Sequence, residues 1–501
     1  MIELHTPQQA AQWLRGLVTG ALRTDSRQVR AGDGFIAWPG AAHDGRQFVE
    51  KAFQQGAVAC LMQAEGSQPW THQQPADRVA TLPGLRHLTG RVADLYCDQP
   101  SDALQVLAVT GTNGKTSIAC WLAQALSAQA NGRPCGLVGT LGIGLWPQLE
   151  YTGMTTPDPV CLQQALRRMV DAGATHCALE ASSIGIAEHR LDGLRIRVAV
   201  FTNFTQDHLD YHLDMDSYWA AKRALFGWDG LQAAVVNVDD PRGAALAAEL
   251  TGTPLQLWTC SRQSSQARLQ ARRLPSPEGL SFEVSEGSQR CRIDTVLTGD
   301  YNIDNLLAVV ATLRCLGWSL AQAALACNQL QAVAGRMQRV RPAQARANAP
   351  LAVVDYAHTP DALRQVLLAL QPLARERGGR LWCVFGCGGD RDPHKRPQMA
   401  AVAEEMADGL VLTSDNPRSE SPSAILSQMR AGLRMPTVAV QIEDRAQAIR
   451  HALQQAKAAD VVLVAGKGHE TTQEVAGVFH PFSDIAQIEA ALSDGVQEVP
   501  A

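Results

Sequence analysis

One glycine-rich segment constrains the fold of this chain more than any other feature. The apolar run 105–110 leads into TGTNGKTS (110–117) and then into a helix-forming stretch. A strand that enters a glycine loop and then a helix turns successive backbone N–H groups toward one point, which suits a phosphate group. We therefore predict a phosphate-binding loop in which Lys115 adds positive charge and Thr116 ligates Mg²⁺. The alternative is a glycine-rich turn with an exposed lysine.

Short apolar runs alternate with helical stretches along most of the chain. Such runs are typical of parallel strands in a sheet that helices cover on both faces. They lie at 105–110, 135–140, 176–180, 198–204 and 233–238 in the central part, and at 350–356, 381–386, 409–415 and 461–468 in the C-terminal part. The segment 260–298 is polar instead, and we expect it to form an antiparallel edge or an insertion.

The 501 residues amount to about three typical domains. In the first 98 residues, shorter apolar pieces such as FIAW (35–38) are broken by turn residues, which favours a small α/β domain. We therefore expect an α/β protein of three domains. These are a small N-terminal α/β domain at 1–98, a central domain with a parallel sheet of the P-loop ATPase type at 99–334, and a Rossmann-like C-terminal domain at 335–501.

Charge, cysteine content and hydropathy exclude several classes of protein. The chain carries 44 Lys and Arg against 49 Asp and Glu, and its net charge of −5 does not supply the basic face of a non-specific nucleic-acid binder. Its 12 cysteines lack paired spacing, which is typical of reduced thiols in the cytoplasm. No secretory signal is visible, and no apolar run reaches the ~18 residues of a membrane span. We expect a cytoplasmic protein with no nucleic-acid partner and no membrane span.

Two polar side chains follow expected strands close to the phosphate loop. Glu180 ends the run 176–180, and His208 lies in the segment TNFTQDHLDYH (202–212). Open α/β sheets bind ligands at the carboxyl ends of their strands, so both residues are candidate ligands of metal ions that bridge phosphates. Structural hydrogen bonding is the alternative. Lys222 lies in an amphipathic helical segment, where a lone lysine is usually a solvated surface residue.

Four polar or glycine-rich loops follow apolar runs in the C-terminal part. They lie at 355–363, 386–397, 414–422 and 465–470. Because they follow strands of one expected sheet, they would rim one crevice. Its positive charges would come from Arg391, Lys395, Arg418 and Lys467, and its acceptors from Asp415 and Glu470. This mixture suits a zwitterionic ligand with carboxylates and ammonium groups. Ordinary turn chemistry is the alternative.

The order of the motifs resembles that of the Mur ligase family, which adds amino acids to the peptide of the bacterial cell-wall precursor. The resemblance runs through TDSRQVRAGDGFIA (24–37), TGTNGKTS (110–117), MTTPDP (154–159), EASSIGIAEHR (180–190), FTNFTQDHLDYH (201–212), YWAAK (218–222), GDYNIDN (299–305), AGRMQ (334–338), DYAHTPDAL (355–363), GCGGDRDPHKRP (386–397), SDNPR (414–418) and AGKGHE (465–470). The DNPR loop is similar to that of diaminopimelate-specific members. The resemblance therefore implies ATP-dependent addition of meso-2,6-diaminopimelate to UDP-N-acetylmuramoyl-L-alanyl-D-glutamate through an acyl phosphate, in peptidoglycan precursor synthesis.

The resemblance also implies a role for each residue that matches a family motif. It assigns ATP to Thr110, Gly111, Thr112, Asn113, Gly114, Lys115, Thr116, Ser117, Asn302, Arg336 and Asp355. It assigns the UDP-substrate to Ser26, Ala41, Ala42, His43, Thr155, Thr156, Ser182, Glu188 and Arg190. It assigns diaminopimelate to Arg391, Asp415, Asn416, Arg418, Gly466 and Glu470. The implied catalytic residues are Lys115, Glu180, His208 and Lys222, and the implied Mg²⁺ ligands are Thr116, Glu180, His208 and Lys222.

Lys222 matches the lysine that is carbamylated in this family. A carbamate replaces the ammonium with a carboxylate-like oxygen pair, which is a hard ligand suited to Mg²⁺. The resemblance implies that 1–98 binds the UDP-substrate, 99–334 binds ATP and 335–501 binds the amino acid. ATP would lie between the second and third domains, so that domain closure assembles the site. We expect a monomer that acts on small-molecule substrates.

Two residues depart from the family pattern, and alternative functions remain. Ile184 stands where the family often has the histidine of SSHG, and Glu188 where it often has glutamine. An ionised Glu188 accepts hydrogen bonds but cannot donate them. The alternatives are a related ligase that uses lysine, a ligase that adds glutamate to folates, and a P-loop switch protein that hydrolyses ATP to change partners. The DNPR loop and the DSR segment (25–27) argue against the first two, and the ligand groups of the third domain argue against the switch.

Overall fold

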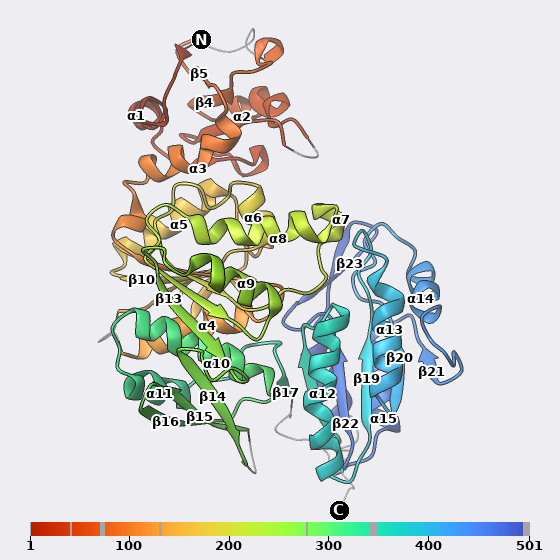
Figure 1. Ribbon diagram of the computed structural model, residues 1–501. Helices are drawn as coiled ribbons and strands as arrows, with labels where there is room; N and C mark the ends of the chain where they lie inside the picture. The colour runs from red at the N-terminus through yellow and green to blue at the C-terminus, as the bar shows by residue number, and fades with distance from the viewer. Residues whose placement is uncertain are drawn as a thin grey trace, which may run out of the picture.

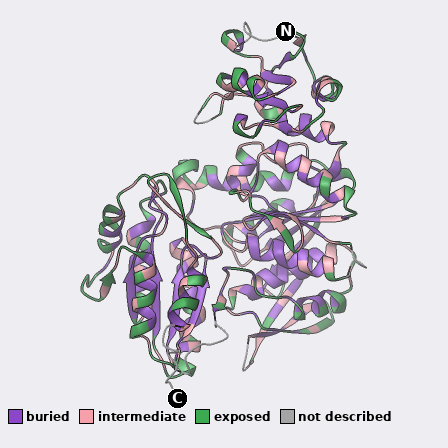
Figure 2. Cartoon of the chain, turned by 180° about the vertical axis from the view of Figure 1, so that it is seen from behind, coloured by how far each residue is buried: buried purple, intermediate pink, exposed green. Residues whose placement is uncertain are grey.

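Three α/β units follow one another along the chain, from the N-terminal unit at the top of Figure 1 to the C-terminal unit at the right. The computed structural model describes residues 2–40, 43–70, 76–129, 133–276, 279–340 and 348–493. In each unit the buried residues concentrate in the strands and on the inner faces of the helices (Figure 2). Among the described residues, no helix is both long and apolar enough to cross a membrane.

The N-terminal unit is built on a five-stranded parallel sheet in the order β1-β5-β4-β3-β2. Its strands are β1 (Ile2–Glu3), β2 (Leu22–Arg23), β3 (Gly34–Ala37), β4 (Ala59–Gln63) and β5 (Val79–Leu82), and its helices are α1 (Pro7–Leu17), α2 (Val49–Gln54) and α3 (Leu85–Tyr96). Successive residues of β4 pack in different apolar clusters, Cys60 with α2 and Leu61 with α1 and α3. The sheet is therefore covered on both faces.

The central unit holds an eleven-stranded sheet in the order β16-β15-β14-β13-β12-β11-β6-β10-β7-β8-β9. Its strands are β6 (Gln105–Thr110), β7 (Gly136–Gly139), β8 (Gly142–Leu145), β9 (Gln148–Glu150), β10 (His176–Glu180), β11 (Ile196–Phe201), β12 (Ala233–Asn237), β13 (Gln256–Ser261), β14 (Leu269–Leu274), β15 (Leu280–Glu286) and β16 (Gln289–Thr295). The strands from β14 to β7 pair in parallel, and the pairs beyond them are antiparallel. The polar segment 260–298 thus forms an edge that is antiparallel in its outer strands.

Helices cover both faces of this sheet. They are α4 (Lys115–Gln129), α5 (Pro159–Asp171), α6 (Ser183–Ala187), α7 (Leu209–His212), α8 (Met215–Ala224), α9 (Pro241–Leu250), α10 (Tyr301–Cys315) and α11 (Leu320–Asn328). Residues of α4, α10 and α11 share one apolar cluster with the sheet, and residues of α5, α8 and α9 share the other. The central strand β6 is buried between these layers, which places its carboxyl end under the phosphate loop.

The C-terminal unit has a six-stranded sheet in the order β17-β18-β22-β19-β20-β21, in which β17 alone is antiparallel. Its strands are β17 (Gln338–Val340), β18 (Leu351–Asp355), β19 (Leu381–Phe385), β20 (Gly409–Leu412), β21 (Ala439–Gln441) and β22 (Val461–Ala465), followed by a hairpin of β23 (Thr472–Val475) and β24 (Val478–Pro481). Helices α12 (Pro360–Glu376), α13 (Lys395–Met406) and α14 (Pro422–Arg430) cover one face, and α15 (Arg445–Gln455) and α16 (Asp484–Ser493) cover the other.

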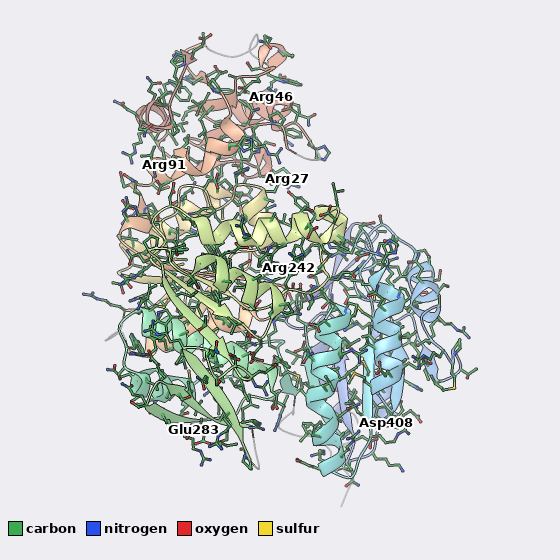
Figure 3. The ribbon with its side chains drawn as sticks, viewed as in Figure 1. Arg27, Arg46, Arg91, Arg242, Glu283 and Asp408 are labelled. Atoms are coloured by element: carbon green, nitrogen blue, oxygen red, sulfur yellow. The ribbon has the colours of Figure 1, made fainter. Side chains whose placement is uncertain are left out.

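Helix α3 joins the N-terminal and central units. Gly90 on α3 approaches the loop after α6 so closely that a Cβ at this position would lie 2.1 Å from the carbonyl oxygen of Asp192. Nearby, Arg91 Nη1 pairs with Asp94 Oδ2 at 2.7 Å, close to the junction of the two units in Figure 3. From the other side, Val160 of α5 packs in the apolar core of the N-terminal unit. The two units therefore share a packed interface.

The chain passes from the central to the C-terminal unit between α11 and β17, and this linker is held against α4. The indole nitrogen of Trp121 donates to the carbonyl of Gln331 at 3.0 Å, and the backbone nitrogen of Gln331 donates to Gln124 Oε1 at 2.9 Å. Further along the linker, Arg336 Nη2 donates to Thr116 Oγ1 at 3.0 Å. The linker thus carries a side chain of the third unit to the phosphate loop.

The Gly90 contact gives a stability prediction. We expect Gly90→Ala to lower the free energy of unfolding by about 1–3 kcal/mol, because the added methyl group must displace the Asp192 carbonyl. Gly16→Ala in helix α1 is the control, because no atom lies within 4 Å of a Cβ at Gly16. We expect this substitution to raise the free energy of unfolding by about 0.5–1 kcal/mol. Chemical unfolding followed by circular dichroism measures both. Equal midpoints for Gly90→Ala and the unmodified chain would show that the contact is not close.

Candidate active site

The phosphate loop lies between β6 and α4, as the sequence predicts. β6 ends at Thr110, and α4 begins at Lys115. Between them, Gly111 and Gly114 have φ angles of 140° and 88°, a region of backbone conformation that favours glycine. A Cβ at position 114 would also lie 2.4 Å from Oδ1 of Asn305 on α10. This geometry requires both glycines of the motif.

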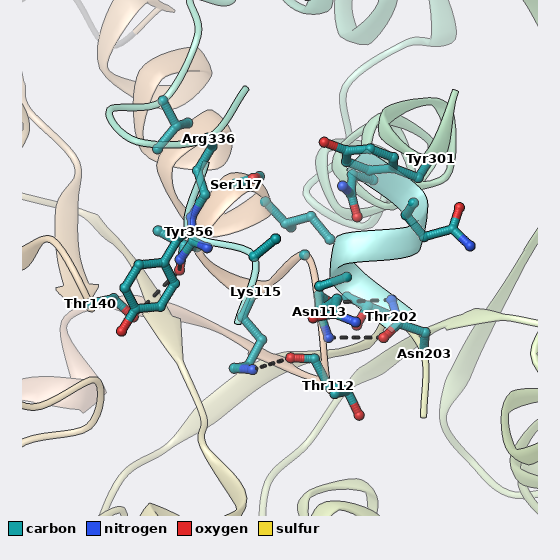
Figure 4. Close-up of a pocket in the computed structure, with 18 of the residues that line it drawn as sticks. Thr112, Asn113, Lys115, Ser117, Thr140, Thr202, Asn203, Tyr301, Arg336 and Tyr356 are labelled. Carbon is teal, nitrogen blue, oxygen red and sulfur yellow. Dashed lines mark hydrogen bonds between the residues drawn. The ribbon is translucent and has the colours of Figure 1, made fainter. Parts of the chain in front are cut away.

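The Lys115 side chain folds back over its own loop (Figure 4). Its Nζ donates to the carbonyl of Gly111 at 3.0 Å and to that of Thr112 at 2.8 Å. The side chain is half-buried. Burial lowers the pKa of the Lys115 ammonium, although Glu180 and Asp207 oppose the shift. The alternative reading of an exposed lysine is therefore wrong.

Glu180 lies at the carboxyl end of β10, which is the parallel neighbour of β6. Its side chain is 1% exposed, and both of its oxygens accept hydrogen bonds. Oε2 accepts from Thr116 Oγ1 at 2.9 Å, and Oε1 accepts from the backbone nitrogen of Thr140 at 2.7 Å. Thr140 is not among the residues predicted from the sequence, although it directly follows β7, which pairs with β10. A carboxylate and a hydroxyl thus meet at the start of α4.

His208 lies in the loop after β11, the other parallel neighbour of β6. Its Nε2 is 3.4 Å from Oδ2 of Asp207. Burial lowers the pKa of His208 to about 4, although Asp207 raises it, so the imidazole is neutral at neutral pH. Burial would raise the pKa of Asp207, but His208 and His358 in their protonated forms, together with Lys395, outweigh it and lower this pKa. Asp207, which directly precedes His208, is not among the residues predicted from the sequence.

Lys222 is a buried residue of α8, which contradicts the reading of a solvated surface lysine. It is 1% exposed, and its Nζ donates to the carbonyl of Gly111 at 2.7 Å. The same nitrogen lies 4.4 Å from the ring centroid of Tyr218, one helical turn earlier. Burial, and secondarily the charge of Lys115, lowers the pKa of Lys222 well below the usual value. Thus α8 places an amine directly beneath the phosphate loop.

A cavity of about 870 Å³ lies between the central and C-terminal units. Sixteen residues assigned a role by the resemblance line it: Thr112, Asn113, Gly114, Lys115, Thr116, Ser117, Thr155, Thr156, Glu180, Ser182, Arg190, His208, Asn302, Arg336, Asp355 and Arg391. Gly111 and Lys222 lie behind this surface, in contact with one another. Asn113 Nδ2 also donates across the cavity to Asp361 Oδ2 of α12 at 3.2 Å. Both units therefore contribute to one site.

The C-terminal unit supplies the cavity with a stacked guanidinium. Arg336 Cζ lies 4.4 Å from the ring centroid of Tyr356, and both side chains are seen in Figure 4. The Asp355 carboxylate accepts at 2.7 Å from the backbone nitrogens of Met337 and Ala357. Burial raises the pKa of Asp355. Both of its oxygens thus brace the loops that present Arg336 and Tyr356.

Two of the expected UDP-substrate residues of the N-terminal unit, Ser26 and His43, follow neighbouring strands on one side of its sheet. Ser26 begins a short 3₁₀ helix after β2, and His43 lies in the loop after β3, its parallel neighbour. Ser26 is buried and His43 is exposed, whereas Ala41 and Ala42 lie outside the described residues. Gln164 Nε2 of α5 donates to the carbonyl of Leu22 in β2 at 2.9 Å, so this edge strand contacts the central unit.

Four further residues expected at the UDP-substrate form a connected group in the central unit. Thr156 Oγ1 donates to the backbone carbonyl of Glu180 at 2.7 Å and lies 2.9 Å from Ser182 Oγ. Arg190 Nη1 donates to the carbonyl of Thr156 at 2.9 Å. Thr155 Oγ1 lies 3.1 Å from the hydroxyl of Thr140. The structure thus brings this group beside Glu180.

Glu188 does not line the cavity but links three elements. Its Oε2 accepts from Arg86 Nη2 of α3 at 2.8 Å, and its Oε1 accepts from the hydroxyl of Tyr211 on α7. Burial would raise the pKa of Glu188, but hydrogen bonds from Tyr211 and Arg86 lower it. Glu188, one of the two departures from the family pattern, is therefore an ionised acceptor. Its partners come from the N-terminal unit (Arg86) and the central unit (Tyr211). Neither partner is among the residues predicted from the sequence.

The residues expected to bind diaminopimelate form a second cluster, which Arg391 alone joins to the cavity. Glu470 Oε2 accepts from Asn416 Nδ2 at 2.9 Å and from Lys467 Nζ at 2.7 Å. Lys467 is fully buried, so its ammonium is held inside this network. Gly466 has a φ of 115°, and a Cβ there would lie 2.5 Å from Asp415 Oδ2. The loops after β20 and β22 are therefore closely packed.

Arg418 spans two loops at the rim of this cluster. Its Nη1 donates to the carbonyl of Gly389 at 2.7 Å, and its Nε lies 3.4 Å from Oε2 of Glu474 in β23. Its φ of 54° lies in the left-handed region. Glu420, in contrast, pairs with the buried Arg396, with Oε1 at 2.8 Å from Nη2. Arg418 therefore keeps one side of its guanidinium next to the loop of Arg391.

Comparisons with known proteins follow the order of the three units. The model described as Mur ligase family, catalytic domain, matches residues 20–94; the Mur ligase middle domain matches 109–313; and the Mur ligase, glutamate ligase domain, matches 335–468. The chain is 56% identical over 496 residues to the UDP-N-acetylmuramoyl-L-alanyl-D-glutamate–2,6-diaminopimelate ligase of Acidovorax sp. (strain JS42), which covers 98% of each chain.

Solved structures show the same architecture. A structure of a UDP-N-acetylmuramoyl-L-alanyl-D-glutamate–2,6-diaminopimelate ligase has a TM-score of 0.64 at 36% identity and covers 94% of both chains. The MurF ligase of Thermotoga maritima in complex with ADP has a TM-score of 0.64 at 16% identity, with 95% of this chain and 97% of that chain covered, which shows a shared fold. The expectation of an α/β fold of three domains is confirmed. The three models in order, with the full-length identity to a named ligase, show that this chain belongs to the Mur ligase family.

Proposed function

We propose that this protein is the ATP-dependent ligase that joins meso-2,6-diaminopimelate to UDP-N-acetylmuramoyl-L-alanyl-D-glutamate. The observation that carries the proposal is the cavity in which the phosphate loop, Glu180 and His208 of the central unit face Arg336 of the C-terminal unit. The 56% identity to a relative of that name over 98% of the chain supports the choice of substrates. We assign the UDP-substrate to 1–98, ATP to 99–334 and the amino acid to 335–501.

The chemistry requires an activated carboxylate. The D-glutamyl carboxylate of the UDP-substrate attacks the γ-phosphorus of ATP, which forms an acyl phosphate and releases ADP. An amine of diaminopimelate then attacks the acyl carbon, and inorganic phosphate leaves with the bonding electrons as the amide forms. The protein contributes by holding the reactants in line and by stabilising negative charge on the transferring phosphoryl group. Lys115 is placed to do so, because its ammonium lies across the phosphate loop.

The residues present fit Mg²⁺. Hard oxygen donors suit this ion, and the Thr116 hydroxyl and the Glu180 carboxylate lie 2.9 Å apart at the start of α4. The neutral imidazole of His208 offers a further donor. Among the described residues, no three His, Cys, Asp or Glu side chains gather into a metal site, so phosphate oxygens and a Lys222 carbamate would complete the ligand set. When bound, Mg²⁺ would neutralise charge on the phosphates.

The direct test is the mass of the product. The protein is incubated with ATP, Mg²⁺ and the UDP-substrate, together with diaminopimelate, lysine or glutamate, and phosphate release is measured with each substrate omitted in turn. We expect an adduct with diaminopimelate and phosphate release that needs all the substrates. An adduct with lysine would indicate a related ligase, and ATP hydrolysis without either substrate would favour a switch protein.

We also propose that the enzyme acts as a monomer in the cytoplasm.

Lys222 gives a prediction about the rate. If its carbamate ligates Mg²⁺, Lys222→Ala should lower kcat by about 10²–10³-fold, the loss expected when one group that stabilises transition-state charge is removed. Lys222→Arg should be equally inactive, because a guanidinium stays cationic and does not ligate a metal. The control is Arg223→Ala on the same helix, where Arg223 makes an exposed ion pair with Glu249. Steady-state kinetics and thermal unfolding are measured together, and an active Lys222→Arg variant would contradict the assignment.

Arg418 gives a prediction about amino-acid choice. Diaminopimelate differs from lysine by a second carboxylate beside its distal ammonium, and a guanidinium binds a carboxylate with two parallel hydrogen bonds. Arg418→Ala should therefore lower the ratio of kcat/KM for diaminopimelate over lysine by about 10–100-fold. Arg364→Ala, which removes an exposed partner of Glu405 in the same unit, is the control. An unchanged ratio with both activities depressed would mean that Arg418 only braces Gly389 and Glu474.

A further inference from the structure

A fully buried ion pair lies within the C-terminal unit, below the loops of the proposed amino-acid site. Arg445 is the first residue of α15 and Asp484 the first of α16, and both side chains are 0% exposed. The pair is bidentate, with Arg445 Nε 2.7 Å from Asp484 Oδ1 and Nη2 2.8 Å from Oδ2. Its two carboxylate contacts fix the plane of the guanidinium.

The other hydrogen bonds of Arg445 connect this pair to two strand ends. Nη2 donates to the carbonyl of Ala465 at 2.8 Å, and Nη1 donates to that of Ser414 at 3.2 Å. Ala465 is the last residue of β22, and Ser414 follows β20. These strands are not neighbours, because β19 lies between them in the sheet. The guanidinium therefore links two strand ends across a third strand.

Both connected positions directly precede residues of the proposed amino-acid site. Asp415 and Asn416 follow Ser414, and Gly466 follows Ala465. The space between the loops is narrow: a Cβ at Gly386, which follows β19, would lie 2.7 Å from the backbone nitrogen of Asp415. A displacement of either strand end would change the separation of the Asp415 and Glu470 loops.

The charge of Arg445 also reaches these loops. Burial would lower the pKa of the guanidinium, but Asp484 outweighs burial and raises it, with smaller contributions in the same direction from Asp415 and Glu470. Asp415 and Glu470, the two carboxylates of the proposed site, are thus close enough to the buried Arg445 to interact with its charge. Glu470 receives a second cation from its own loop, Lys467.

We propose that the Arg445–Asp484 pair is a positioning pair that sets the spacing of the Asp415–Arg418 and Gly466–Glu470 loops and thereby the affinity for the amino-acid substrate. The proposal rests on the proposed function. A positioning role for this pair can be distinguished by experiment from a role in stability alone. Well-packed apolar residues of similar volume often replace a buried ion pair with little loss of stability, whereas removal of one partner leaves an unpaired buried charge. A positioning role predicts that apolar replacement restores stability and leaves substrate affinity impaired.

The test compares Asp484→Asn with the double variant Arg445→Met/Asp484→Leu. The control is Asp460→Asn, because Asp460 is a buried carboxylate at the opposite end of β22 that accepts from Trp382 Nε1 at 3.1 Å and from the backbone nitrogen of Arg380 at 2.8 Å. For each variant, KM for diaminopimelate, KM for ATP, kcat and the thermal midpoint are measured on the full chain.

We expect both pair variants to raise KM for diaminopimelate by about tenfold or more and to leave KM for ATP within about twofold, because loop displacements of about 1 Å are enough to misplace a bound substrate. The double variant should regain part of the thermal midpoint lost in Asp484→Asn without regaining KM, and Asp460→Asn should change the midpoint only. Parallel changes in both KM values, or an unchanged KM for diaminopimelate in a folded variant, would overturn the proposal. If the unmodified chain ligates a different amino acid, the proposed function fails. The positioning role of the Arg445–Asp484 pair is then tested by the change in KM for that amino acid, judged against the change in KM for ATP as above.

Discussion

Parallel strands end side by side, and the site of this protein depends on that constraint. In the central sheet, β10 and β11 flank β6. The sheet topology alone therefore places Glu180 and the loop of His208 beside the phosphate loop. In the C-terminal sheet, the loops after β19, β20 and β22 meet in the same way. The reactive groups come from distant parts of the sequence because the topology of each sheet collects them at one edge.

The part of the site that follows from this rule could be predicted from the sequence. The runs 105–110 and 176–180 form β6 and β10 with the expected bounds, and two residues predicted at or beyond their carboxyl ends, Glu180 and Thr116, are in contact. Burial of Lys222 could not be predicted in this way. Its helix has an ordinary amphipathic pattern, and its hydrogen-bond acceptor, Gly111, is separated from it by 111 positions.

Local sequence pattern also does not reveal which charged side chains are paired within the protein. From spacing alone, Lys467 and Arg418 are equivalent cations in loops after strands, yet Lys467 is fully buried against Glu470 while Arg418 lies at the rim. The sequence likewise does not reveal that Glu188 is paired, because Arg86 lies in another unit. Which charges remain for a ligand depends on long-range packing, and local patterns do not contain that information.

The attachment of α3 has a consequence for how the three units can move. Arg86 and Gly90 lie one turn apart on this helix and contact Glu188 and Asp192 of the central unit. Two separate points of contact on one rigid helix, together with the covalent connection, remove the rotations that a single contact would allow. The N-terminal and central units then form one platform. The domain closure expected from the sequence would then be a motion of the C-terminal unit relative to this platform, to which the linker that carries Arg336 connects it.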